Sequence, residues 1–239
     1  MNPNVKNELA PAGKLRVGVN LGNFLLVNKD PAGGAPRGIV PDLAQELGRR
    51  LGAQVELVTF AGAGETADGA RAGTWDIAFI GAEPQRAEQI AFTPAYLEIP
   101  ATYLVPAGSP IQSLAEVDRP GVRIAVSARS AYDLYLSRNL KHAQLVRAEG
   151  IPASYDLFVA GKLDVLAGLL PRLVTDVERL PGARVLEGKF TAVQQAVGTP
   201  KARAQGAAWL REFVADIKAT GLVAQLIERH KARGVTVAP

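Results

Sequence analysis

Short apolar runs and amphipathic stretches alternate along the start of the chain. The runs at 15–20 and 54–60 read LRVGVN and QVELVTF, a composition typical of strands. Between them, Leu43, Leu47 and Leu51 recur every four residues and form one apolar stripe. This spacing predicts a helix between the two strands, and therefore a β-α-β unit.

The next segments extend this unit into a sheet. A shorter, weaker helix is predicted at 65–72, before the apolar run DIAFI at 76–80, which is bounded by Gly81. A short, continuous apolar run of this kind suits a buried parallel strand better than a helix. The first hundred residues therefore predict a parallel sheet with crossover helices.

The alternation restarts after residue 110 and predicts a second α/β unit. Strands are expected at 121–127, 143–148, 163–168 and 183–188, and helices at 130–140 and 152–161. Residues 190–200 are expected to be extended. Two final helices follow, with apolar faces formed by Leu210, Phe213, Val214 and Ile217 and by Leu222, Val223, Leu226 and Ile227, and no strand is expected after them. This order is expected of a chain that crosses into a second lobe and returns to complete the first.

Composition sets limits on the class of protein. The 239 residues are 48% hydrophobic and 21% charged, which is ordinary globular composition. No stretch reaches the roughly 18 apolar residues of a membrane span, and the first residues lack the apolar core of a secretory signal. Either the protein is cytoplasmic, or Met1 begins a chain whose leader has been removed and which works in the periplasm. The absence of cysteine fits the periplasm and excludes disulfides and thiol chemistry.

The net charge of +4 raises the question of a nucleic-acid partner. The basic residues are scattered, and no block of lysine and arginine is interleaved with aromatic residues. Because nucleic-acid binding needs a concentrated positive surface, no nucleic-acid partner is expected. A modest positive charge can also favour the approach of small anions.

Motifs for common catalytic sites and cofactors are missing. The glycine-rich segment at 61–69 lacks the Gly-Lys-Ser/Thr of a phosphate loop and the spacing of a dinucleotide fingerprint, so a flexible loop is expected there. His142 and His230 stand far apart, without metal-binding or nucleophile spacing, and are interpreted as surface residues. The sequence therefore predicts no catalytic residues, no metal and no cofactor.

Two strand ends carry groups suited to anions. Arg86 follows the predicted strand at 76–80 by a few residues, and its guanidinium matches the planar geometry of a carboxylate. Ser130 is placed as the N-cap of a helix, where backbone N–H groups can meet an anion. Ligands of open α/β sheets bind at the carboxyl ends of the strands, which is where both residues are predicted to lie.

An ordered series of segments resembles the family 3 extracellular solute-binding proteins, the amino-acid-type receptors of ABC importers. The series is LRVGVN, GIVPDLAQELGRRLG, AGTWDIAFIGAEPQRAEQIAFTPAY, TYLVPAGSPIQSLAEV, GVRIAVS and GKLDVLAG, and the resemblance extends from Leu15 to the last helices.

The resemblance implies the α/β fold of type II periplasmic binding proteins, with two lobes that close on one small ligand. Residues 1–103 and 195–239 would form the first lobe and 104–194 the second, with crossovers near 101–106 and 190–196. It further implies a monomer that delivers its ligand to an ABC transporter permease. In the family pattern, an arginine at the place of Arg86 grips the carboxylate of the ligand.

The sequence departs from the family pattern at several binding positions. Leu169 stands where an acidic residue usually holds the ammonium group of the ligand. Asn20 replaces another common acidic residue, and Asn23, with Phe24 beside it, replaces an aromatic ring. The usual hydroxyl-rich run before Arg86 is replaced by Gly81-Ala82-Glu83-Pro84. The ligand is therefore expected to be a small carboxylate, either an amino acid or a related organic acid.

Three questions stay open at this stage. Glu83 could contact the ligand, or it could pair with Arg86 and orient it. Of Gln194 and Gln195, alternation along a strand lets only one face the ligand, and Gln195 is the predicted one. The alternative to a receptor is an enzyme resembling the cyclohexadienyl dehydratases, with Glu83 as the general acid.

Overall fold

The computed structural model describes residues 3–239, which form two compact units. Unit 1 comprises the chain up to Glu98 together with Gln194–Pro239, and unit 2 comprises Ile99–Val193. The chain passes from one unit to the other within two long strands, β5 (Leu97–Val105) and β10 (Thr191–Pro200). Both units are α/β, as the sequence predicts.

The sheet of unit 1 has the strand order β2-β1-β3-β10. Strands β1 (Lys14–Asn20), β2 (Gln54–Phe60) and β3 (Ile77–Gly81) are parallel, and β10 runs antiparallel to β3. The short strand β4 (Ile90–Phe92) pairs with β10. The carboxyl ends of the three parallel strands therefore lie at the same end of the sheet. Strand β10 runs in the opposite direction beside β3.

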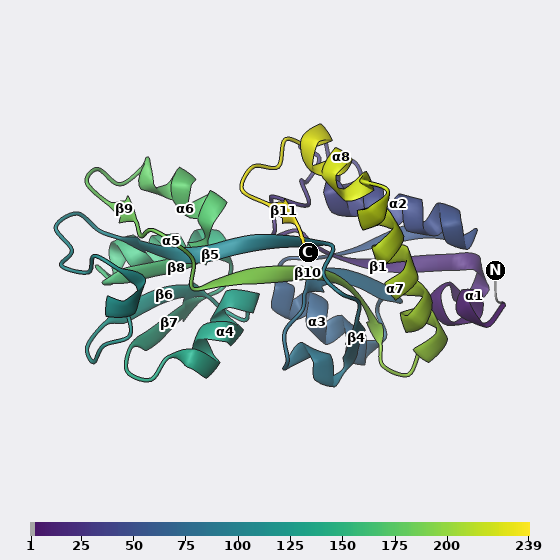
Figure 1. Cartoon of the computed structure of the whole chain (residues 1–239), viewed down its shortest axis with the longest axis horizontal. Helices are drawn as coiled ribbons and strands as arrows, with labels where there is room; N and C mark the ends of the chain where they lie inside the picture. Colours follow the sequence, from purple (N-terminus) through teal and green to yellow (C-terminus); the bar gives the residue numbers. More distant parts are fainter. Residues whose placement is uncertain (1–2) are drawn as a thin grey trace. The chain divides into compact units, whose positions relative to one another are not determined.

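The helices of unit 1 are α1 (Pro3–Leu9), α2 (Ile39–Leu51), α3 (Ala63–Ala72), α7 (Ala204–Ala219) and α8 (Leu222–Arg229). Figure 1 shows α2 and α8 on one side of the strands and α3 on the other. In α2, the predicted leucine stripe is buried, and the helix ends at Gly52 with a left-handed φ of 64°. The four-residue spacing therefore correctly predicts this helix and its buried face.

A buried charge cluster holds the amino end of β3. Asp76 is fully buried and accepts hydrogen bonds from the Arg16 side chain at 3.0 and 2.8 Å and from Arg203 at 2.8 Å. Burial alone would raise the pKa of Asp76, but the hydrogen bonds from Arg16 and Arg203 outweigh it and hold that pKa below its usual value. The cluster links β1, β3 and the start of α7. It lies at the amino ends of the parallel strands, away from their carboxyl ends.

Two predictions for unit 1 are wrong. The helix predicted at 65–72 is present as α3, but it begins two residues earlier, at Ala63, and packs its small residues on Trp75 and Ile80, so most of the segment 61–69 predicted as a flexible loop is helical. A Cβ at Gly69 would lie 2.4 Å from Trp75 Nε1, so the glycine permits close approach of the helix to the ring. A strand also follows the last helices, since β11 (Thr236–Val237) pairs with the start of β5.

The sheet of unit 2 has the order β5-β8-β6-β7, with β8 (Val165–Leu169), β6 (Arg123–Ser127) and β7 (Gln144–Ala148) parallel. Strand β5 is antiparallel to β8 and also pairs with β9 (Arg184–Val185), which is much shorter than predicted. The helices are α4 (Ala131–Asn139), α5 (Ile151–Ala160) and α6 (Leu170–Val177), the last of which the sequence analysis did not predict.

The core of unit 2 lies under α5 and α6 and includes Leu104, Tyr155, Phe158, Leu166 and Leu173. Short 3-10 helices occur at Pro11–Gly13, Arg86–Glu88 and Leu114–Glu116. None of the helices between residues 3 and 239 has the length and apolar character needed to cross a bilayer.

Candidate functional site

The loop after β1 carries three of the predicted site residues in unit 1. Asn20 ends β1, and its Oδ1 accepts a hydrogen bond from Gly22 N at 2.9 Å, which forms a tight turn. The backbone oxygen of Asn23 accepts from Leu26 N and Val27 N, each at 3.0 Å. Phe24 is an exposed large hydrophobic residue, with 37% of its surface accessible. The turn therefore displays Phe24 while it fixes the backbone of Asn23.

Asn23 carries an unsatisfied polar atom. The residue is 8% exposed, and its buried Oδ1 has no hydrogen-bond partner among residues 3–239. A buried acceptor left without a donor costs about 1–3 kcal/mol, so native proteins normally provide a partner for it. A hydrogen-bond donor on a ligand would relieve this cost.

The carboxyl end of β3 places Gly81 and Arg86 together. Arg86 begins a 3-10 helix and is 6% exposed, and its Nη1 donates to Gly81 O at 2.7 Å. The guanidinium thus folds back over the strand end instead of extending into water. Because a guanidinium carries five N–H donors in a planar fork, it can brace this loop and still bind a carboxylate.

Strand β10 brings Gln195 to the same strand end. Gln195 is buried and lies opposite Gly81 in the antiparallel pair β3–β10. Gln194 donates from Nε2 to Glu98 Oε2 at 2.9 Å, so its side chain is engaged elsewhere. Glu83, half-buried, lies between Gly81 and Arg86 in the loop, and its backbone oxygen accepts from Ala87 N at 2.9 Å.

In unit 2, Ser130 is the N-cap of α4, as predicted. Its Oγ accepts a hydrogen bond from Asp133 N at 3.1 Å, which satisfies one of the free amides at the helix start. The Asp133 carboxylate is buried and accepts from Arg129 N at 2.8 Å and from Arg147 Nε at 3.0 Å. Arg129 has a left-handed φ of 56°, a conformation that this contact helps to hold.

Two hydroxyl groups missed by the sequence analysis lie beside Ser130. Tyr132 is buried, and its hydroxyl is hydrogen-bonded to the side chains of Ser127 and Ser130. Burial raises the pKa of Tyr132 to about 12, although these hydrogen bonds act in the opposite direction. The carboxyl end of β6 therefore presents a neutral cluster of hydroxyl groups next to the start of α4.

Leu169 lies at the carboxyl end of the neighbouring strand β8 and is the N-cap of α6. It is 5% exposed and offers no polar group at this position. Arg172, in the first turn of α6, donates from Nε to the buried carboxylate of Asp176 at 2.8 Å. The positive charge of Arg172 also acts to lower the pKa of Tyr132, although burial outweighs this effect. Unit 2 thus carries a cation near the hydroxyl cluster and an apolar residue at the end of β8.

The two histidines do not join these groups. His142 is exposed in the loop before β7. His230 lies at the end of α8, where its Nε2 is 2.8 Å from Asp42 Oδ2, and is half-buried rather than a simple surface residue. No group of three or more histidine, aspartate or glutamate side chains suited to a metal ion occurs in the described part of the chain.

The family model of the bacterial extracellular solute-binding proteins, family 3, matches residues 15–232. The chain belongs to this family. The match spans both units and includes every predicted site residue, from Asn20 to Gln195. No curated protein sequence matches the chain significantly.

Several solved structures of binding proteins share the fold of this chain. The cysteine-binding protein of Campylobacter jejuni has a TM-score of 0.79 and 18% identity, with both chains covered fully. A putative ABC transporter binding component from Wolinella succinogenes, complexed with lysine, has a TM-score of 0.76 and 24% identity, and the alignment covers 91% of this chain and 95% of that one. The fold is therefore that of the type II periplasmic binding proteins.

A reconstructed ancestral amino acid-binding protein, described as a precursor of cyclohexadienyl dehydratase, is also similar. Its TM-score is 0.76 at 22% identity, with 93% of this chain and 97% of that chain covered. It is itself an amino acid-binding protein.

Proposed function

We propose that this family 3 protein is the solute receptor of an ABC importer and binds a small carboxylate-bearing molecule, an amino acid or a related organic acid. The observation that carries the proposal is the buried guanidinium of Arg86 over the carboxyl end of β3. Strand carboxyl ends are where open α/β sheets bind ligands. A carboxylate is the small anion whose geometry a guanidinium fork matches.

Other residues of unit 1 would define the remainder of the ligand. Asn23 Oδ1 is buried without a donor, which favours a ligand that carries an N–H or O–H group. Phe24 offers an exposed aromatic face for an apolar part of the ligand. Gly81 and Gln195 would line the floor beside Arg86, and Glu83 would either contact the ligand or orient Arg86.

Residues of unit 2 would contact the same ligand in this proposal. Ser130, Ser127 and Tyr132 provide hydroxyl groups at the carboxyl end of β6, and Leu169 provides an apolar surface. A ligand that contacts both units stabilises the arrangement in which both can reach it, so binding would be coupled to closure. The permease partner and the periplasmic location are part of this proposal, and membership of the family supports both.

A thermal-shift screen of amino acids and small organic acids tests the proposal. A ligand at 100 times its dissociation constant stabilises the folded state by about 2.7 kcal/mol, which corresponds to about 5–10 °C in Tm for a chain of this size. Compounds that raise the Tm should be recovered unchanged. The proposal is wrong if none of the carboxylates raises the Tm, and chemical conversion of a stabilising compound would favour the enzyme alternative.

Leu169→Asp tests whether this position contacts the ligand. If Leu169 lines the site, aspartate should either improve the affinity for α-amino acids or, where no ammonium group reaches it, destabilise the protein by several kcal/mol as a buried unpaired charge. Calorimetry with amino acids and a urea melt separate the two outcomes. A variant unchanged in both binding and stability would show that Leu169 lies outside the site.

A further inference from the structure

Unit 2 contains a second pocket, distinct from the proposed solute site. It has a volume of about 870 Å³ and is formed by the segments 106–111, 119–122, 158–164 and 180–183. These segments follow β5 or precede β6, β8 and β9. The pocket therefore lies at the amino ends of the parallel strands β6 and β8, whereas Ser127 and Leu169 lie at their carboxyl ends.

Most of the lining is apolar and conformationally restricted. Four prolines line the pocket: Pro106, Pro110, Pro120 and Pro181. We therefore refer to this pocket as the proline groove. Proline fixes its own φ, so loops that contain it lose little freedom when a ligand binds. Val159, on the last turn of α5, lies in the groove and is 44% exposed, so its side chain is accessible to a ligand there.

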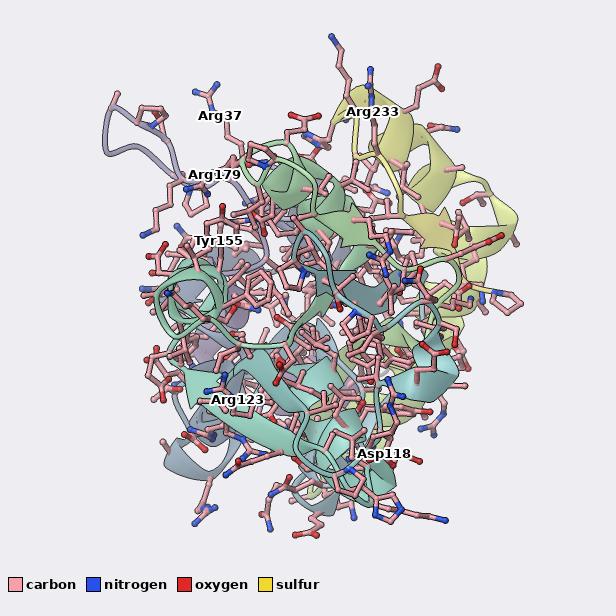
Figure 2. All side chains as sticks on the ribbon, turned by 90° about the vertical axis from the view of Figure 1, so that its left-hand side faces the viewer. Arg37, Asp118, Arg123, Tyr155, Arg179 and Arg233 are labelled. Carbon is pink, nitrogen blue, oxygen red and sulfur yellow. The ribbon has the colours of Figure 1, made fainter. Side chains whose placement is uncertain are left out.

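Arginine side chains brace the walls of the groove. Arg184 donates from Nη2 to the backbone oxygens of Ser109, at 3.2 Å, and Ile111. Arg123 donates from Nη2 to Lys162 O at 2.8 Å, and its backbone N–H donates to Asp164 Oδ2, also at 2.8 Å. Figure 2 shows Arg123 on the face of unit 2 that is turned toward the viewer. The groove is therefore formed before any ligand binds.

The rim of the groove is positively charged. Arg119 and Lys162 both line it and are exposed, and neither has an acidic partner within the described residues. Arg119 donates from Nε only to the backbone oxygen of Glu116, at 2.7 Å. The one acidic lining residue, Asp164, is 3.7 Å from Arg123 Nε and is thereby compensated. Two cations at the edge of an apolar groove favour a ligand with an apolar body and an anionic head.

We propose that the proline groove binds an amphipathic anion, specifically an alkyl carboxylate of medium chain length. The chain would lie on the prolines and Val159, and the carboxylate would face Arg119 and Lys162. The volume falls within the range of about 300–1,000 Å³ that is usual for small-molecule sites. All the residues involved belong to unit 2, so this proposal does not depend on the identity of the solute bound near Arg86.

Calorimetric titration of the whole chain with hexanoate, octanoate and decanoate tests the proposal. The Arg86→Ala variant serves as the background, because an alkyl carboxylate could otherwise bind at the solute site. One equivalent should bind, and each added CH₂ group should tighten binding about three- to fourfold. Octylammonium should bind more weakly than octanoate, and the double variant Arg119→Gln/Lys162→Gln should weaken octanoate binding by about two- to fivefold for each cation.

Val159→Asp and Val174→Asp form a matched pair of variants. Both valines are exposed on helices of unit 2, at 44% and 49%, but only Val159 lines the groove. Val159→Asp should weaken octanoate binding at least about tenfold, since it places a carboxylate against both the chain and the head of the ligand. Val174→Asp should have no effect, and with the native Arg86 neither variant should change solute binding at the carboxyl ends of the strands.

The proposal is overturned if the Arg86→Ala protein does not bind octanoate, or if its affinity does not depend on chain length. Equal losses in Val159→Asp and Val174→Asp would also overturn it, because a general effect of added negative charge would then explain the result. Failure of these tests leaves the thermal-shift screen for the solute unaffected, and the two proposals can therefore fail separately.

Discussion

Arg86→Ala is expected to weaken binding of the carboxylate solute by about 30-fold to several thousandfold. Removal of the guanidinium leaves the ligand carboxylate buried without its partner charge, which costs about 2–5 kcal/mol. The fold should be nearly intact, because loss of a hydrogen bond such as that to Gly81 O costs only about 1 kcal/mol. Calorimetry with the solute found in the screen, run beside a thermal melt, measures both effects.

Two further variants make this result specific. Arg86→Lys should recover only part of the affinity, because an ammonium group cannot reproduce two parallel hydrogen bonds. Arg71→Ala removes the same charge from the exposed end of α3 in the same unit and should bind normally. If Arg86 only braces its loop, Arg86→Ala will lower the Tm and hardly change binding, and the anchoring role is then wrong.

Asp76→Asn is expected to destabilise the protein by about 3 kcal/mol without changing the solute site directly. Asp76 is fully buried between Arg16 and Arg203, and removal of its charge leaves two partly buried cations without an anion. Urea unfolding followed by tryptophan fluorescence, to which Trp75, the buried neighbour of Asp76, contributes, measures this change. Glu56→Gln is the control, since Glu56 forms an exposed pair with Lys14 at 4.0 Å, has only the smallest of the charge effects on Arg16, and should contribute less than about 1 kcal/mol.

The same cluster has a defined pH dependence. Because the folded-state pKa of Asp76 is lower than its unfolded value, the stabilisation by Asp76 is present above about pH 4 and is lost as the pH falls through the folded pKa. The difference in unfolding free energy between the native protein and Asp76→Asn should therefore narrow below about pH 4. A difference that stays constant down to pH 2 would contradict the assigned charge of Asp76.

Elements with a strong local pattern were predicted well from the sequence. The leucine stripe of α2 and the continuous apolar run of β3 are properties of neighbouring residues, and both are present where expected. Strand β11 was missed because it is only two residues long and pairs with β5, which is far away in the sequence. Such a pairing leaves no pattern in the neighbouring residues. The helix predicted at 65–72 is present in α3, but its earlier start at Ala63 depends on packing against Trp75, which lies outside the glycine-rich segment.

The candidate site residues also divide into those with a local sequence pattern and those without one. Arg86 and Ser130 could be placed from the sequence because each follows a recognisable strand at a short distance. Tyr132 was missed because a buried aromatic residue in a helix ordinarily belongs to the core, and its contacts with Ser127 and Ser130 depend on side-chain geometry. The unsatisfied Oδ1 of Asn23 could not be predicted either, since the absence of a donor depends on every neighbour of the atom.

The measurement that tests the central claim most directly is a calorimetric comparison of the best ligand from the screen with its primary amide. The amide keeps the approximate shape of the carboxylate, removes its charge and replaces one acceptor oxygen with an NH₂ donor, so it cannot accept two hydrogen bonds from a guanidinium fork. If Arg86 holds the carboxylate, the amide should bind the native protein at least about 30-fold more weakly, and Arg86→Ala should bind the two compounds almost equally. Equal affinity of the native protein for the acid and its amide would contradict the claim that this protein selects a carboxylate.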